Sequence, residues 1–173
     1  MAPIVVAMRA RPRLAPLLLA AASDIQPIDD ALAPLGLAPD HRLVLDTEQA
    51  LPALMAEATG SSLDPLLQLI APDLVLVQGD TAGTFAAACS ADCLGIPVGH
   101  VMADAQHGGD GNHIAIDRIS TLLFAPDAQA MARLAADPRV SGACHLVGDS
   151  RTAAGSSGIV TVIENYRDAE NVT

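Results

Sequence analysis

The stretch that decides the fold is Asp73-Leu-Val-Leu-Val-Gln-Gly-Asp-Thr-Ala-Gly-Thr84. Its first half is a continuous apolar run that follows Pro72 and ends at Gly79. Such a run is typical of a strand that is covered on both faces. Its second half leads from Asp80 into an Ala-rich span, 81–93, that is long enough for a helix. A buried strand followed directly by a helix is the repeating unit of an α/β fold with a parallel sheet.

Apolar runs that predict further strands lie on both sides of this stretch, and helix-like spans alternate with them. The predicted strands are 3–8, 42–46, 73–78, 96–101, 122–125 and 144–147, and the predicted helices are 13–22, 48–70, 81–93 and 127–136. The last helix has Asp127 as its N-cap. The alternation predicts a Rossmann-like parallel sheet flanked by helices over residues 1–152. Residues 153–173 are predicted to form a Gly/Ser-rich linker and a short tail strand at 159–163.

The composition excludes several classes of partner. Nine Lys and Arg against 20 Asp and Glu give a net charge of −11, so the chain lacks the basic excess that nucleic acid or anionic lipid requires. Aromatic residues make up 2% of the chain, too few for a base-stacking surface. Three cysteines cannot all pair within one chain, which favours a reducing compartment. We therefore expect a cytoplasmic protein that binds neither nucleic acid nor membrane.

The N-terminus has a second interpretation, because Arg9, Arg11 and Arg13 precede an apolar run at 14–22. A basic region followed by an apolar region is also typical of a secretory signal peptide. The apolar stretch before the arginines favours a first strand instead. No apolar run reaches the ~20 residues that a transmembrane helix needs.

Parallel sheets bind ligands beyond the carboxyl ends of their strands, so the polar residues of those loops are the candidates for a site. Asp80 is either an acid or base for proton transfer or merely the N-cap of the next helix. Thr81 and Thr84 can donate hydrogen bonds to a ligand, and the helix N-terminus beside them favours an anion such as a diphosphate. Arg11 and Arg13 can bind a phosphate or carboxylate, or they are solvated charges.

The loops after the fourth and sixth predicted strands supply further candidates. The first of them carries a histidine cluster with two nearby carboxylates: His100, His107, His113, Asp104 and Asp110. Their spacing matches no common metal-binding pattern, so no metal is expected. Histidine has an ordinary pKa near neutrality, which makes His113 a candidate acid or base. In the second loop, Asp149 either contacts a ligand or lies in a surface turn.

Five stretches, read in order, resemble the N-terminal half of the non-hydrolysing UDP-N-acetylglucosamine 2-epimerases. They are Arg11-Pro-Arg-Leu-Ala-Pro-Leu17, Pro72-Asp-Leu-Val-Leu-Val-Gln-Gly-Asp-Thr81, Gly95-Ile-Pro-Val-Gly-His-Val101, Ile116-Asp-Arg-Ile-Ser-Thr-Leu-Leu-Phe-Ala-Pro126 and Leu146-Val-Gly-Asp149. The resemblance implies one half of a GT-B fold, with a UDP-sugar in the cleft between two halves and no cofactor. In that family the C2 proton of the sugar is removed and replaced while UDP is transiently eliminated. The resemblance implies Asp80 as a proton-transfer carboxylate and Arg11 and Arg13 as ligands of the diphosphate.

Other positions depart from the pattern of that family. Met102 stands where the family has a Glu, and His113 stands where it has an Arg. The shortened loop at 104–112 lacks the family's Glu pair, for which Asp110 is a candidate remnant. The family's second domain, which holds most UDP contacts, has only a faint counterpart at 159–165.

These departures leave two classes of function open. One is an epimerase-like enzyme, with catalytic residues Asp80, Asp110 and His113, whose competence is in doubt without the missing groups. The other is a non-catalytic nucleotide-sugar binding or regulatory module, or an oligomeric scaffold subunit. Both classes predict a homo-oligomer or a partner subunit, because a face that once met a second domain would be apolar.

Overall fold

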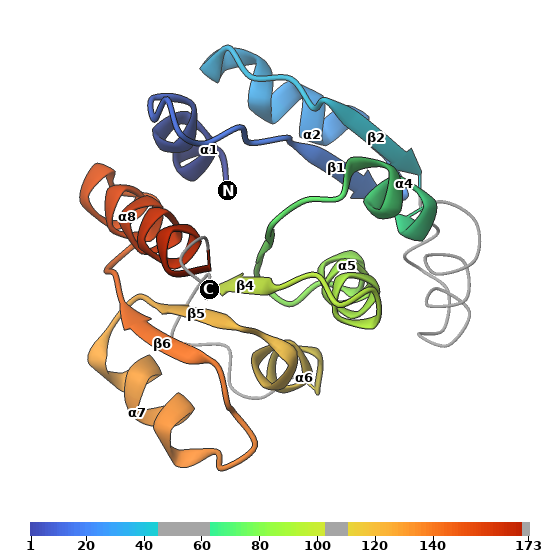
Figure 1. Ribbon diagram of the computed structural model, residues 1–173. Helices are drawn as coiled ribbons and strands as arrows, with labels where there is room; N and C mark the ends of the chain where they lie inside the picture. The colour runs from blue at the N-terminus through green and yellow to red at the C-terminus, as the bar shows by residue number, and fades with distance from the viewer. Residues whose placement is uncertain (45–62, 103–110, 171–173) are drawn as a thin grey trace.

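The computed structural model describes residues 1–44, 63–102 and 111–170, and Figure 1 shows their arrangement. The N-terminal elements are α1 (Ala2–Arg9), β1 (Leu19–Ala22), α2 (Gln26–Leu32), the 3₁₀ turn η1 (Ala33–Leu35) and β2 (His41–Val44). The central elements are α4 (Leu63–Ile70), β3 (Val75–Gln78), α5 (Ala82–Cys93) and β4 (Val98–Val101). The C-terminal elements are α6 (Gly111–Ile119), β5 (Leu122–Ala125), α7 (Ala128–Ala136), β6 (Ala143–Leu146) and α8 (Ala153–Glu170).

All strand pairs in the described residues are parallel, and they form two sheets. One sheet has the order β3-β4-β5-β6, and the other pairs β1 with β2. In the larger sheet, consecutive strands are joined by α5, α6 and α7, so the carboxyl ends of its strands lie along one edge. The prediction of a Rossmann-like parallel sheet flanked by helices is therefore confirmed.

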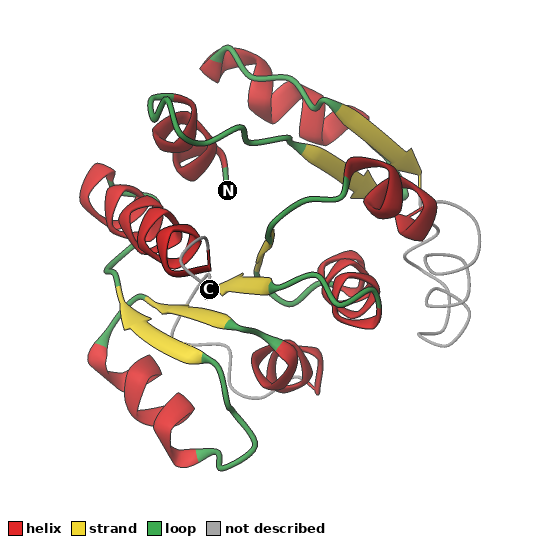
Figure 2. Ribbon diagram, in the orientation of Figure 1, coloured by secondary structure: helices red, strands yellow, loops and turns green. Residues whose placement is uncertain are grey.

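Helices cover both faces of the larger sheet, because its strands carry apolar side chains on both faces. Leu123 and Ala125 of β5 pack with α7, whereas Leu122 and Phe124 pack with α8. Figure 2 shows these two helices on opposite sides of β5 and β6. This alternation follows the two-residue period of a strand and explains why β5 is apolar throughout.

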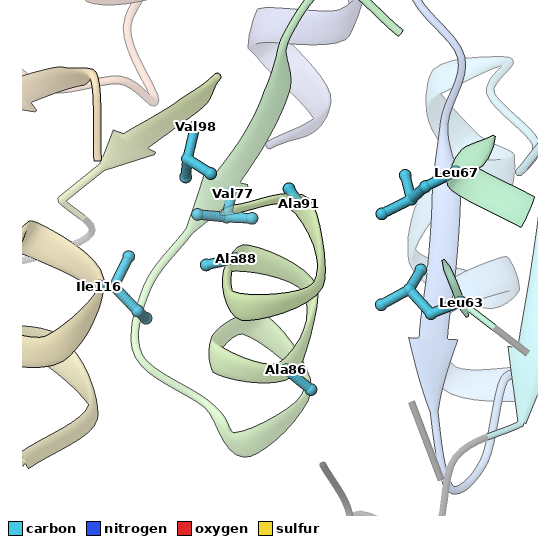
Figure 3. Packing of buried hydrophobic residues seen from close by; sticks show 8 residues of the cluster. All are labelled: Leu63, Leu67, Val77, Ala86, Ala88, Ala91, Val98 and Ile116. Carbon is cyan, nitrogen blue, oxygen red and sulfur yellow. The ribbon is translucent and has the colours of Figure 1, made fainter. Parts of the chain in front are cut away.

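A second part of the core surrounds α5, the helix that follows the stretch Gln78-Gly-Asp-Thr81. Small side chains on α5 let it lie close to its neighbours, as Figure 3 shows for Ala86, Ala88 and Ala91. They pack with Val77 and Val98 of the sheet and with residues of α4 and α6. The start of α5, which carries the candidate threonines, is therefore supported by a buried helix.

Two predictions for the N-terminal residues are wrong. Residues 3–8 form α1 rather than a strand, because Pro3 is tolerated in the first turn of a helix and Ile4 and Val5 are buried on that helix. The predicted helix at 13–22 is a loop followed by β1. Pro16 cannot donate a helical hydrogen bond, and Asp40 instead accepts one from the Leu18 amide at 2.7 Å.

The predicted linker and tail strand after residue 152 are also wrong, because these residues form α8. Thr152 accepts a hydrogen bond from the Gly155 amide at 3.1 Å and so caps the helix. A Cβ at Gly155 would lie 2.0 Å from the Asp149 carbonyl oxygen, so only glycine fits there. Ile159 and Val160 are fully buried beside Ile4 of α1.

The remaining secondary-structure predictions agree better with the structure. The predicted helix at 81–93 is α5, and Asp127 caps α7 by accepting from the Ala130 amide at 2.8 Å, as predicted. Part of the predicted helix at 48–70 is α4, and its earlier residues lie outside the described ranges. Within those ranges, no helix is long and apolar enough to cross a bilayer.

Candidate functional site

The candidate site begins where β3 ends. Gly79 has φ +79°, a left-handed conformation that glycine adopts at little cost. Its amide donates to the Val101 carbonyl at 3.2 Å, which ties the turn to the neighbouring strand β4. The chain then passes through Asp80 into α5, so the Asp80 side chain lies at the carboxyl edge of the larger sheet.

The N-cap of α5 is Thr81 and not Asp80. Thr81 Oγ1 accepts a hydrogen bond from the Thr84 amide at 3.2 Å, and the two threonine hydroxyls lie 2.8 Å apart. Thr84 Oγ1 lies 3.4 Å from the Gln78 carbonyl oxygen and donates to it. The interpretation of Asp80 as an N-cap is therefore wrong. Its carboxylate accepts no hydrogen bond from any residue that the structure describes, which leaves it available to a ligand.

Two histidines and a carboxylate lie next to this turn. His100 of β4 is fully buried, with Nδ1 2.7 Å from Asp117 Oδ1 and Nε2 3.0 Å from the Gly79 carbonyl oxygen. His113 of α6 places Nε2 3.4 Å from Asp117 Oδ2, and its ring meets that of His100 edge to face. Burial lowers the pKa of His113, while the negative charges of Asp117 and Asp80 oppose that shift. His113 therefore favours its neutral form, which can accept a proton.

The predicted diphosphate ligands lie in the loop after α1, where α8 supplies their counter-charges. The guanidinium of Arg13 is paired with Asp168, and this hydrogen bond raises the pKa of Arg13. Arg11 Nε lies 3.9 Å from Glu164 Oε2. Arg167 of α8 also donates to the Arg13 carbonyl. The arginine side chains are largely exposed, so these ion pairs compete with water.

A cavity of about 1170 Å³ opens between β1 and β3. It brings together three predicted ligand-binding residues from two loops: Arg13, Thr81 and Thr84. Its walls are largely apolar, with side chains of α1, β1 and β3. A concave, largely apolar space with a few convergent polar groups is typical of a small-molecule site. Four other predicted residues that the structure describes do not line this cavity: Arg11, Asp80, His113 and Asp149. Asp80 is, however, the direct neighbour of Thr81.

The remaining candidates are placed elsewhere or lie outside the described residues. Asp149 accepts from the Arg151 amide at 2.9 Å and from Arg151 Nε at 3.0 Å, and these bonds lower its pKa. It therefore lies in a local turn, which agrees with the alternative interpretation at that position. Asp104, His107 and Asp110 lie outside the described ranges. In the part of the chain that the structure describes, no three His, Cys, Asp or Glu side chains gather to hold a metal.

The sequence analysis missed two polar residues of α6. Asn112 Nδ2 donates to the Asp80 carbonyl oxygen at 3.2 Å, and Asp117 contacts both His100 and His113. The four-residue spacing of His113 and Asp117 places them on one side of a helix and was the available signal. It was not used because no helix was predicted at 111–119.

The fold and the site define a class of protein, namely a Rossmann-like domain with a ligand site beyond the carboxyl ends of its parallel strands. Comparison with known families makes this class specific. The family model described as UDP-N-acetylglucosamine 2-epimerase matches residues 7–170, so the chain belongs to that family. The resemblance inferred from the five sequence stretches is thereby confirmed.

Individual relatives agree with this assignment. The UDP-N-acetylglucosamine 2-epimerase of Bacillus subtilis (strain 168) is 31% identical over 160 residues, which cover 87% of this chain and 41% of the relative. The S. aureus MnaA–UDP co-structure is 28% identical with a TM-score of 0.76, over 87% of this chain and 41% of that one. The UDP-GlcNAc 2-epimerase from Neisseria meningitidis bound to UDP-GlcNAc is 22% identical, with a TM-score of 0.74 over 96% and 46% of the two chains, and supports the fold.

The chain spans less than half the length of these relatives. This coverage confirms the prediction that the domain corresponds to one half of a GT-B epimerase.

Proposed function

We propose that this domain binds a UDP-sugar at the carboxyl edge of its larger sheet and that Asp80 is a proton-transfer group of an epimerase reaction at the sugar C2. The observation that carries the proposal is the capping of α5 by Thr81, which leaves the Asp80 carboxylate without a hydrogen bond from any other residue that the structure describes. Relatives with the same fold include structures with UDP and with UDP-GlcNAc, which supports the choice of ligand class.

The diphosphate is proposed to lie between the two loops that meet at the cavity. Arg13 offers a guanidinium, which binds phosphate oxygens through paired N–H groups. Thr81 and Thr84 offer hydroxyls at the N-terminus of α5, where the helix dipole favours negative charge. Arg11, in the same loop as Arg13, adds a second positive charge. The sugar would then extend toward Asp80, which directly precedes Thr81.

Inversion at C2 removes a proton from one face of the sugar and returns one to the other face, so it needs two proton-transfer groups. Asp80 is proposed as one of them, and His113 is the described residue best suited to be the other, because burial favours its neutral, basic form. Asp110 stays a proposed catalytic residue that lies outside the described ranges.

A second candidate function is a nucleotide-sugar binding module without catalysis. Met102 favours it, because this residue stands where the resemblance calls for a Glu and is only 2% exposed, packed beside Leu123 and Ala125. An apolar side chain in that position can transfer no proton. In this case the site would retain its anion-binding groups and lose the chemistry.

Proton NMR of the domain with UDP-N-acetylglucosamine in heavy water separates the two functions. Catalysis predicts that solvent deuterium enters C2 and that Asp80→Asn abolishes this exchange. Asp92→Asn, which alters an exposed carboxylate near the end of α5 and outside the cavity lining, is the matched control and should exchange like the unmodified chain. Saturation transfer to the nucleotide without exchange at C2 would support the binding module. Absence of both signals would contradict the proposal.

A further inference from the structure

The backbone around Asp80 is held from both sides by side chains of other elements. His100 Nε2 lies 3.0 Å from the Gly79 carbonyl oxygen, and Asn112 Nδ2 donates to the Asp80 carbonyl oxygen at 3.2 Å. These two carbonyls belong to the planar peptide groups on either side of the Asp80 Cα. Their hydrogen bonds therefore fix the direction in which the Asp80 side chain leaves the chain.

The surroundings of His100 also determine where its protons lie. A carbonyl oxygen can only accept a hydrogen bond, so Nε2 carries a proton and donates it to Gly79. Nδ1 lies 2.7 Å from a carboxylate oxygen of Asp117. If Nε2 carried the only proton of the ring, the lone pair of Nδ1 would face the ionised carboxylate of Asp117. Two hydrogen-bond acceptors would then lie opposite each other. A hydrogen bond between Nδ1 and Asp117 therefore needs a proton between these two atoms.

We infer that His100 and Asp117 are positioning residues that hold Asp80 in place through the Gly79 carbonyl. Asp117 orients the imidazole ring and keeps its Nε2–H directed at Gly79, and His100 carries that restraint to the turn before Asp80. Both residues are buried, His100 completely, so water competes little for the hydrogen bond between them. The inference rests on the proposed function, because it treats Asp80 as a residue of the ligand site.

Two substitutions of His100 test its two hydrogen bonds separately. The amide nitrogen of Gln can occupy the position of Nε2, so His100→Gln keeps a donor to Gly79 and gives up the bond to Asp117. The amide nitrogen of Asn can occupy the position of Nδ1, so His100→Asn keeps the bond to Asp117 and gives up the one to Gly79. His145→Gln, on strand β6 of the same sheet, where β5 separates it from β4, is the control for replacing a half-buried histidine.

Binding of UDP and exchange of the Gly79 amide are measured on all three variants. We expect His100→Gln to bind UDP within about threefold of the unmodified chain and His100→Asn to bind about tenfold more weakly, the effect of one lost hydrogen bond at a site. The Gly79 amide, which donates to Val101, should exchange faster only in His100→Asn. Equal affinities and equal exchange rates in the two His100 variants would overturn the inference.

The same experiment distinguishes this inference from the proposed function. If the unmodified chain does not bind UDP, the proposed function fails, while exchange of the Gly79 amide still tests whether His100 holds the turn before Asp80.

The unmodified chain gives a further test that needs no substitution. The ¹⁵N spectrum of its histidine rings should show a proton on His100 Nε2 that exchanges slowly with solvent. An unprotonated Nε2 would overturn the inference.

Discussion

The two sides of the candidate site are held in different ways. On the Asp80 side, partly buried hydrogen bonds from His100 and Asn112 fix the turn. On the arginine side, exposed ion pairs with Glu164 and Asp168 of α8 hold the loop. Buried polar bonds are costly to break, whereas exposed ion pairs add little and are screened by salt. The comparison indicates that one side is formed before a ligand binds and that the other side adjusts to it.

The largest expected effect is on the buried side. Asp117→Ala leaves His100 without its charge partner, so the free energy of unfolding should fall by about 3–5 kcal/mol. Urea denaturation followed by circular dichroism measures it. Asp168→Ala removes the carboxylate of an exposed pair and should leave the free energy of unfolding nearly unchanged. Equal losses in the two variants would contradict the difference between the two sides.

The N-cap residue of α5, Thr81, is expected to affect both the free energy of unfolding and the affinity for UDP. Thr81→Ala removes the acceptor for the Thr84 amide and should lower the free energy of unfolding by about 1 kcal/mol. Asp127→Ala removes the equivalent cap of α7 and should cost a similar amount. Of these two variants, Thr81→Ala alone should bind UDP more weakly in a titration, because Thr81 lines the cavity and Asp127 does not. A comparable loss of affinity in Asp127→Ala would show that the effect is one of stability.

A smaller effect is expected on the arginine side. Asp168→Asn removes the charge that competes with a phosphate for Arg13, so UDP should bind about two- to fivefold more tightly, within the range of an exposed ion pair. The gain should shrink as salt is added, since exposed charges are screened. Calorimetric titration at two ionic strengths measures both. Weaker binding in this variant would mean that the contact with α8 orients Arg13 for the ligand.

The smallest effect concerns the pH dependence of stability. Burial lowers the pKa of His113 below its ordinary value of about 6.5, so the unfolded chain takes up this proton at a higher pH than the folded chain. The stability that the neutral ring contributes is complete above about pH 6.5 and is lost as the pH falls through the folded pKa. Denaturation of His113→Gln should therefore show a shallower loss of stability as the pH falls below about 6.5. Identical pH profiles for the two chains would contradict this assignment.

Sequence reasoning succeeded where the signals are local and failed where tertiary packing decides. The end of β3 and the start of α5 were predicted, because an apolar run, a glycine and an Ala-rich span follow one another directly. Residues 3–8 combine Ile and Val in a pattern typical of a strand, yet burial of Ile4 and Val5 on α1 overrides that preference. At the start of α8, Gly155 serves close packing against Asp149 rather than flexibility.

The same limit applies to the candidate site. The loop at the end of β3 supplied Asp80 and Thr81, because the position of a ligand site in a parallel sheet is general. Arg13 was predicted to follow a strand at 3–8, whereas the structure places it in the loop after α1. Which of Asp80 and Thr81 caps α5 depends on a hydrogen bond that the sequence alone left open. The pairing of His100 with Asp117 needs the placement of α6 beside β4, so only the structure reveals it.

Backbone hydrogen exchange with and without UDP compares the two sides of the site in one experiment. The Gly79 amide donates to Val101 beside Asp80, and the Leu14 amide donates to the Arg11 carbonyl oxygen in the arginine loop. We expect the Gly79 amide to exchange slowly in the free chain and to be unchanged by UDP, whereas the Leu14 amide should exchange quickly and be slowed by UDP. Protection of Gly79 that appears only with UDP, or a Leu14 amide that does not respond to UDP, would contradict this difference between the two sides.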